Sequence, residues 1–156
     1  MAELPKSWKQ ELNGCATVVE ALALVTRTFA ADSGTLHRKW PNGVLHLEAV
    51  VGNFPPVVLA AIRTIPIGKG MAGLAAERRA PVTACNLQSD ISGDVRPGAR
   101  ATGMEGAIAI PCFGGTDGHE LVGVLGVASF APREFTPVEH LALLEWGRAL
   151  CGRWSG

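Results

Sequence analysis

The sequence predicts an α+β domain in which helices at both ends of the chain flank a central antiparallel sheet. Two observations carry this prediction. Segments of helical spacing cover residues 6–30 and 136–154, and two apolar strands cover 106–112 and 121–129. The loop between those two strands is too short for a crossover helix, so we expect them to pair antiparallel.

The whole chain, 1–156, is expected to form one domain, because its 156 residues contain no internal repeat and no long linker. The N-terminal helix belongs to residues 1–30, the sheet and a pocket to 34–130, and the C-terminal helix to 136–154. Hydrophobic residues make up 47% of the chain and charged residues 18%, which suits a buried core and excludes a disordered chain.

The first element is a long helix over residues 6–30, because its apolar side chains recur at helical spacing. The tripeptide Asp32-Ser33-Gly34 ends this helix. Two strands follow at 35–40 and 43–51, and Pro41-Asn42-Gly43 between them is typical of a hairpin turn.

The second strand alternates between two faces, and one face is expected to carry Leu45, Leu47, Ala49 and Val51. Pro55-Pro56 then starts a short helix that extends to about Arg63.

The segment from residue 65 to 85 opens with a glycine-rich turn that leads into a helix over 70–79 and a strand over 81–85. Its pattern Gly68-x-Gly70-x-x-Gly73 is similar to a phosphate-binding loop, but Pro66 precedes it and the following strand ends at Cys85-Asn86 without the acidic residue of a dinucleotide site. We therefore interpret the glycines as serving a tight turn and close helix packing.

A cavity is predicted over the two central strands, because these carry small residues in place of bulky ones. The small residues are Gly106, Ala107, Ala109, Gly123 and Gly126. The polar segment 86–104 is tethered at both ends by apolar strands, so it is expected to arch over this space as a lid.

The last helix begins at Thr136-Pro137-x-Glu139, with threonine as the N-cap. Its apolar residues lie on two sides, with Leu141, Leu144 and Cys151 on one and Leu143, Trp146, Leu150 and Trp154 on the other. A helix with two apolar faces needs two partners, which predicts a homodimer in which a second chain covers the latter side.

Charge and hydropathy exclude several classes of protein. The 14 basic and 14 acidic side chains cancel, so nothing favours binding to nucleic acid or to an anionic membrane. No apolar run reaches the ~20 residues of a spanning helix, and the polar N-terminus is unlike a signal peptide. A cytoplasmic location is expected. The four cysteines, Cys15, Cys85, Cys112 and Cys151, are too scattered for a zinc site.

The order of these motifs from residue 65 to 130, with the strand ending Ala49-x-x-Gly52 and Phe135-x-x-x-Glu139 further on, resembles the GAF domain. The resemblance implies a six-stranded antiparallel sheet with the first and last helices on one face. It also implies a small-molecule pocket on the other face under the lid 86–104. The function that the resemblance implies is that of a sensory or regulatory domain. Such a domain signals through its terminal helices to a separate effector protein.

Two ligands of the GAF family are disfavoured by its own motifs. Cyclic-nucleotide domains carry Asn-Lys…Phe…Asp-Glu, but here Phe135 stands alone and Glu139-His140 replaces the acidic pair. Bilin domains attach their chromophore to a cysteine of the lid, and no cysteine occurs from residue 86 to 111. Haem-binding members use a histidine, for which His46 is a candidate, although a partly exposed strand histidine is the simpler interpretation.

One enzyme of this fold is the free methionine-(R)-sulfoxide reductase, which needs a nucleophilic and a resolving thiol in its pocket. The resemblance places one family cysteine at Ala72, which carries no thiol, and the lid has none. Cys85 and Cys112 fall near the pocket in the pattern but match the family cysteines poorly. This enzyme is one alternative function, and a dimerisation module with a vestigial pocket is another.

The candidate site contains no catalytic residue and no metal ligands, and the sequence does not name a cofactor or ligand. We predict contacts to the ligand from His46, Asp90, Asp94, Arg96, Arg100, Met104 and Cys112. Within the lid, Arg96 and Arg100 are suited to an anionic group, although an ordinary charged loop explains them equally well.

Overall fold

The computed structural model describes residues 8–88 and 103–152. Its centre is a six-stranded sheet in the order β3-β2-β1-β6-β5-β4, in which every neighbouring pair is antiparallel. The strands are β1 (Ser33–Lys39), β2 (Val44–Val51), β3 (Thr64–Pro66), β4 (Val82–Ala84), β5 (Gly106–Gly114) and β6 (Glu120–Ser129). The predicted α+β class and antiparallel sheet are confirmed.

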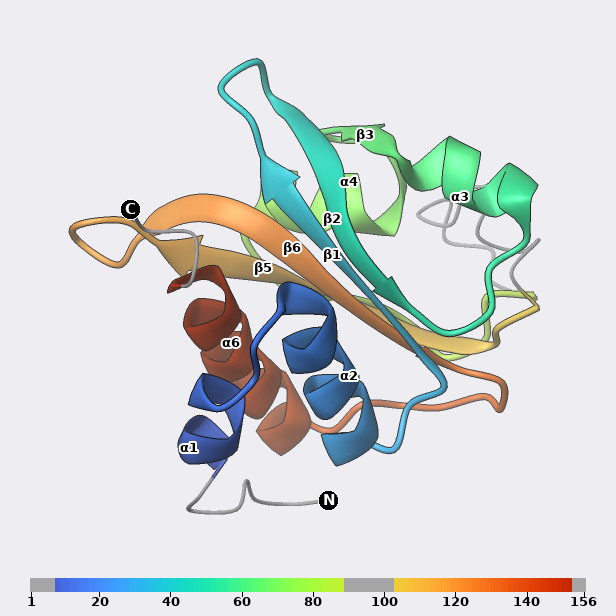
Figure 1. Cartoon of the computed structure of the whole chain (residues 1–156). Coiled ribbons are helices and arrows are strands. Elements are labelled where there is room, and N and C mark those ends of the chain that lie inside the picture. Colours follow the sequence, from blue (N-terminus) through green and yellow to red (C-terminus); the bar gives the residue numbers. More distant parts are fainter. Residues whose placement is uncertain (1–7, 89–102, 153–156) are drawn as a thin grey trace.

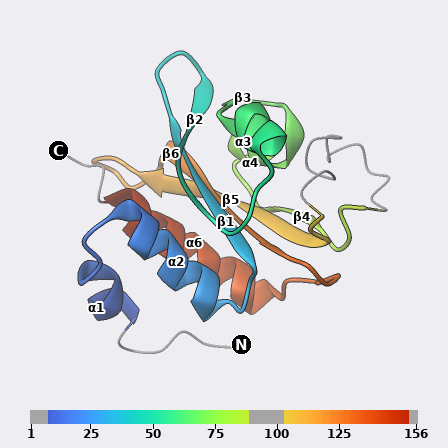
Figure 2. The same cartoon turned by 45° about the vertical axis from the view of Figure 1, so that its right-hand side comes forward.

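Helices cover both faces of this sheet. They are α1 (Trp8–Asn13), α2 (Val18–Thr28), α3 (Pro56–Ile62), α4 (Gly70–Arg78) and α6 (Pro137–Cys151). Helices α1, α2 and α6 lie together on one face, whereas α3 and α4 lie on the other (Figure 1, Figure 2). One apolar core joins the first group to the sheet, and a second core joins α4 to the opposite face.

The predicted single helix over residues 6–30 is wrong, because the described part of that segment forms two helices. Thr17 is the N-cap of α2, and its hydroxyl accepts a hydrogen bond from the Glu20 N–H at 3.1 Å. The Glu20 carboxylate in turn accepts from the Ala16 N–H at 2.8 Å. These side-chain contacts start a new helix, and the apolar spacing continues across the break because both helices bury side chains in one core.

The predicted alternation of β2 is also wrong, because a bulge interrupts the pairing of β1 with β2. Leu36 pairs with Ala49, whereas the next residue, His37, pairs with Leu47. The unpaired residue of β2 reverses the alternation of side chains. As a result Leu45 packs in the core beside α4, and Ala49 packs in the core beside α2 and α6.

The central pair β5 and β6 is antiparallel from Gly106 opposite Ser129 to Gly114 opposite Glu120, which confirms the prediction. The sequence of these strands is apolar on both faces because each face is covered. Ile110, for example, lies in the core with α6, and its neighbour in the chain Ala109 lies in the core with α4. The short helix predicted after Pro55 is confirmed as α3, and the edge strand β3 follows it.

Helix α6 begins with the capping motif that the sequence predicts. The Thr136 hydroxyl accepts from the Glu139 N–H at 3.1 Å, and the Glu139 carboxylate accepts from the Thr136 N–H at 3.0 Å. The other Glu139 oxygen lies 2.7 Å from the Arg133 guanidinium, which also donates to the Phe29 carbonyl at 2.6 Å. This network ties the start of α6 to the end of α2.

The side of α6 that was predicted to meet a second chain is instead buried within this one. Leu143 and Trp146 are 0% exposed and Leu150 is 1% exposed, and all three pack in the core with α1, α2 and the sheet. The apolar side chains of α6 that remain at the surface are Leu141, which is 67% exposed, and Val138, which is 48% exposed. The prediction for Trp154 lies outside the described residues. Within residues 8–88 and 103–152, no helix has the length and apolar character needed to cross a membrane.

Candidate ligand-binding site

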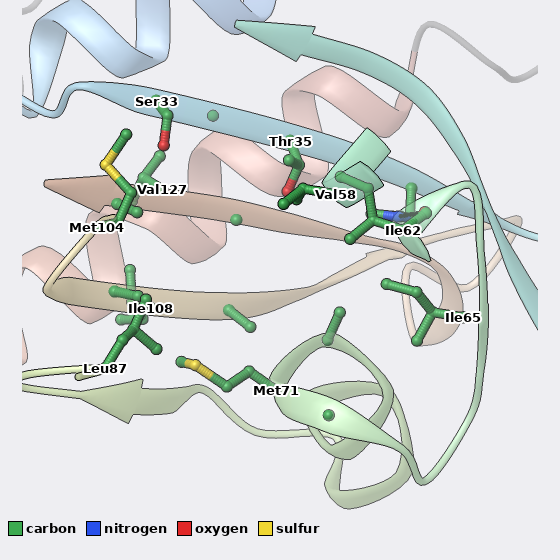
Figure 3. Close-up of a pocket in the computed structure, with 18 of the residues that line it drawn as sticks. Ser33, Thr35, Val58, Ile62, Ile65, Met71, Leu87, Met104, Ile108 and Val127 are labelled. Atoms are coloured by element: carbon green, nitrogen blue, oxygen red, sulfur yellow. Dashed lines mark hydrogen bonds between the residues drawn. The ribbon is translucent and has the colours of Figure 1, made fainter. Parts of the chain in front are cut away.

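A cavity of about 460 Å³ lies between the sheet and the layer formed by α3 and α4. Strands β1, β6 and β5 form its floor through residues that include Thr35, Gly126 and Ala109. Val58 of α3 and Met71 of α4 line its other sides (Figure 3). A mostly apolar cavity of this size, with a few polar groups, is typical of small-molecule sites.

The cavity exists because the floor strands carry small residues at the positions that face α3 and α4. Ala107, Ala109 and Gly126 line it, as the sequence predicts. A Cβ atom at Gly126 would lie 2.6 Å from Thr35 Oγ1, so glycine also leaves room for that hydroxyl. Gly106 makes no such contribution, because the segment after β6 fills the space where its Cβ would stand.

Polar groups of the cavity come mainly from β1. Ser33, Thr35 and His37 alternate along the strand, so they share the face that lines the cavity. His37 is 2% exposed, and its Nε2 lies 2.8 Å from the Ile62 carbonyl oxygen. Burial lowers the pKa of His37, the Ile62 hydrogen bond raises it, and nearby His46 lowers it further. Because the net shift is downward, the imidazole is neutral at neutral pH.

The glycine turn before α4 forms another wall. Lys69 and Gly70 line the cavity, so the positive end of the α4 dipole borders it. Gly68 and Gly70 have φ angles of 96° and 67°, and a Cβ at Gly73 would lie 2.5 Å from the Pro66 carbonyl oxygen. The tight turn and close packing predicted for these glycines are therefore present.

Among the predicted ligand-binding residues, Met104 lies at the cavity. It is 1% exposed and lines the cavity together with Leu87 (Figure 3). The Gln88 side chain donates to the Met104 carbonyl at 2.8 Å, which holds this part of the wall in place. The predictions for Asp90, Asp94, Arg96 and Arg100 lie outside the described residues.

His46 and Cys112 lie away from the cavity, which corrects their predicted position. The His46 ring stacks on Trp40 with 3.6 Å between ring centroids. Cys112 is 0% exposed on the opposite face of the sheet, where its Sγ would lie 2.9 Å from a Cβ at Gly147 of α6. Gly123 pairs with Cys112 and shares that face, so it does not contribute to the cavity either.

Ser33, Thr35 and His37 are not among the ligand-binding residues predicted from the sequence. Ser33 falls in the segment interpreted as a helix stop, and Thr35 and His37 fall in the predicted strand 35–40, where neither is assigned a role. The available signal is their alternation with Gly34 and Leu36. That alternation predicts a shared face, but it does not show that this face meets a cavity.

The chain's four cysteines all fall within the described residues, and none lines the cavity. Cys85 is exposed, Cys15 is half-buried, and Cys112 of β5 and Cys151 of α6 are buried in the core between this helix and the sheet. Burial raises the pKa of the Cys151 thiol, and its hydrogen bond with Cys112 raises it further. Cys151 therefore remains protonated at neutral pH and is a poor nucleophile.

Residues 15–146 match the family model of the GAF domain. The fold is similar to that of a free methionine-R-sulfoxide reductase from Neisseria meningitidis solved with its substrate, at 20% identity and a TM-score of 0.71 over 94% of this chain and 83% of that one. The fold is also similar to the GAF domain of a phosphoenolpyruvate-protein phosphotransferase from Coxiella burnetii. The identity is 21% and the TM-score 0.72, over 94% of this chain and 88% of that one.

A putative GAF sensor protein from Burkholderia vietnamiensis gives 18% identity and a TM-score of 0.70 over 93% of this chain and 87% of that one. A comparison with curated proteins gives no match. The similar structures thus include an enzyme, a GAF domain of a phosphotransferase and a putative GAF sensor protein, and at these identities they show a shared fold.

Proposed function

This chain belongs to the GAF domain family, and on that premise we propose that it is a sensory or regulatory domain that binds a small molecule. The observation that carries the proposal is the apolar cavity of about 460 Å³ over β1, β6 and β5. The cavity is open to solvent on one side, so the apolar side chains that line it stay in contact with water until a ligand covers them, which is unfavourable. A ligand that occupies the cavity would offset this cost.

The terminal helices are suited to carry the signal to a separate effector protein. Helix α2 ends at Thr28, and β1 begins at Ser33, whose side chain lines the cavity. Leu36, on the other face of β1, packs in the core with α2 and α6. A ligand that shifts β1 therefore moves a strand against which both helices pack.

Filling the cavity from its floor tests this function. Ala109→Phe places a ring in the space over β5, so we expect the variant to remain folded and to lose any small molecule that the wild type retains. Native mass spectrometry of the purified proteins measures the retained molecule. Ala16→Phe, at an exposed position before α2, is the size-matched control and should retain it. An Ala109→Phe protein that carries the same ligand would contradict the proposal.

The alternative function is that of a free methionine-(R)-sulfoxide reductase, which the structural similarity to such an enzyme favours. The positions of the cysteines speak against it, since none lines the cavity. We expect no thioredoxin-coupled turnover of free methionine-(R)-sulfoxide. The oxidation of NADPH measures this turnover. Turnover that disappears in Cys85→Ser, the exposed cysteine, or in Cys112→Ser would establish the enzyme and overturn the sensor proposal.

A homodimer through the terminal helices also remains a proposal, with its contact moved to exposed side chains. Val19 of α2 is 50% exposed, and Val138 and Leu141 of α6 are 48% and 67% exposed. Light scattering at micromolar concentration is expected to give a dimer that Leu141→Glu dissociates. Val57→Glu, at a 71% exposed position on α3, should leave it intact. A wild type that is monomeric throughout would exclude the dimer.

A further inference from the structure

His37 carries a buried ring nitrogen for which the described residues provide no hydrogen-bond partner. This atom is Nδ1, and the side chain is 2% exposed and lines the cavity. A buried polar atom that makes no hydrogen bond is unfavourable, and such atoms in native proteins usually mark a missing partner. The cavity is the space from which a ligand could supply that partner.

The other nitrogen of His37 determines what Nδ1 can bind. Nε2 lies 2.8 Å from the Ile62 carbonyl oxygen, which only accepts hydrogen bonds, so Nε2 carries the hydrogen. Burial lowers the pKa of His37, and the neutral ring carries a single hydrogen. Nδ1 therefore presents a lone pair and acts as an acceptor.

We propose that the cavity selects a neutral small molecule with an apolar body and a hydroxyl or N–H group that donates to His37 Nδ1. This inference rests on the proposed function. Apolar side chains such as Val58, Ile65 and Met71 line the cavity and would contact the apolar body of the ligand (Figure 3). A carboxylate at this position is disfavoured, because its oxygens and the Nδ1 lone pair are all hydrogen-bond acceptors. A cation is disfavoured by Lys69 and the positive end of α4.

Thr35 provides the matched control for His37. It lies two residues earlier on β1, on the same face, and its hydroxyl also borders the cavity (Figure 3). Thr35→Val removes this hydroxyl with little change in shape and leaves His37 in place. If His37 makes the selective contact, the preference for a donor survives Thr35→Val and is lost in His37→Phe.

Calorimetry with probe pairs that differ by one donor tests the proposal. The pairs are indole with 1-methylindole and 2-naphthol with 2-methoxynaphthalene. Wild type and Thr35→Val should bind the donor of each pair about tenfold more tightly or better, and His37→Phe should bind both members about equally. Equal binding by the wild type, or a preference that persists in His37→Phe, would overturn it.

Nitrogen-15 NMR of the His37 ring in the wild type tests the same inference without a variant. We expect Nδ1 to be unprotonated and its resonance to move when indole is added but not when 1-methylindole is added. A proton on Nδ1, or an unchanged resonance, would overturn the inference. If no probe binds but native mass spectrometry shows a retained molecule, the donor rule is wrong and the sensor function stands. A cavity that is empty in both experiments removes both proposals.

Discussion

Replacing Trp146 by alanine is expected to lower the free energy of unfolding by about 3–5 kcal/mol. The side chain is 0% exposed on α6, and its ring centroid lies 4.4 Å from that of Trp8 and 6.4 Å from that of Phe29. Alanine would therefore leave a cavity at the point where α1, the end of α2 and α6 meet. Urea denaturation followed by circular dichroism measures the loss.

Two further substitutions on α6 sharpen this test. Leu141→Ala, at a position that is 67% exposed, should change stability by no more than about 0.5 kcal/mol. Trp146→Phe should fall between the two, because it leaves a smaller cavity and removes an indole N–H that has no hydrogen-bond partner among the described residues. Trp146→Ala with wild-type stability but a lost dimer would show that Trp146 serves an interface between chains.

Elements with a local signal could be predicted from the sequence. The start of α6 depends on Thr136 and Glu139, which lie three residues apart and satisfy each other's backbone N–H groups. The antiparallel pairing of β5 and β6 follows from their short loop. The cavity over the sheet could be predicted in part from Ala107 and Ala109, because the small size of these side chains is evident from the sequence alone.

Features that depend on contacts between distant segments could not be predicted. The β2 bulge is a property of its pairing with β1, and it decides whether Ala49 faces α2 or α4. His37 is buried because the end of α3 brings the Ile62 carbonyl to it across 25 positions of the chain. Cys112 falls near the pocket in the order of the motifs, but its strand is apolar on both faces, so the sequence gives no indication of which face the thiol occupies.

Glu139→Ala is expected to lower the free energy of unfolding by about 2–4 kcal/mol, since it removes the carboxylate half of the capping box and a charge-assisted hydrogen bond to Arg133. The Glu139 and Arg133 side chains are 6% and 21% exposed, so the loss leaves the guanidinium largely buried without its carboxylate. Arg133 would retain its hydrogen bond to the Phe29 carbonyl, which limits the cost. Urea denaturation at neutral pH measures the effect.

The contribution of Glu139 should also depend on pH. Burial acts to raise the pKa of its carboxyl, but the Thr136 N–H, the Arg133 hydrogen bond and the Arg133 charge outweigh it, so the pKa lies below the ordinary value of 4.5. A carboxyl whose pKa is lower in the folded state stabilises the fold fully above its unfolded pKa, and this stabilisation is lost as the pH falls through the folded value.

The stability difference between wild type and Glu139→Gln should therefore be constant near neutral pH and shrink as the pH falls below about 4.5. Glu145→Gln makes the same chemical change at an exposed position of α6 and serves as the matched control. We expect this control to follow the wild type closely across the same range. A Glu139→Gln curve that runs parallel to the wild type into acid would show that the carboxylate charge does not hold α6 to the end of α2, and that packing alone does.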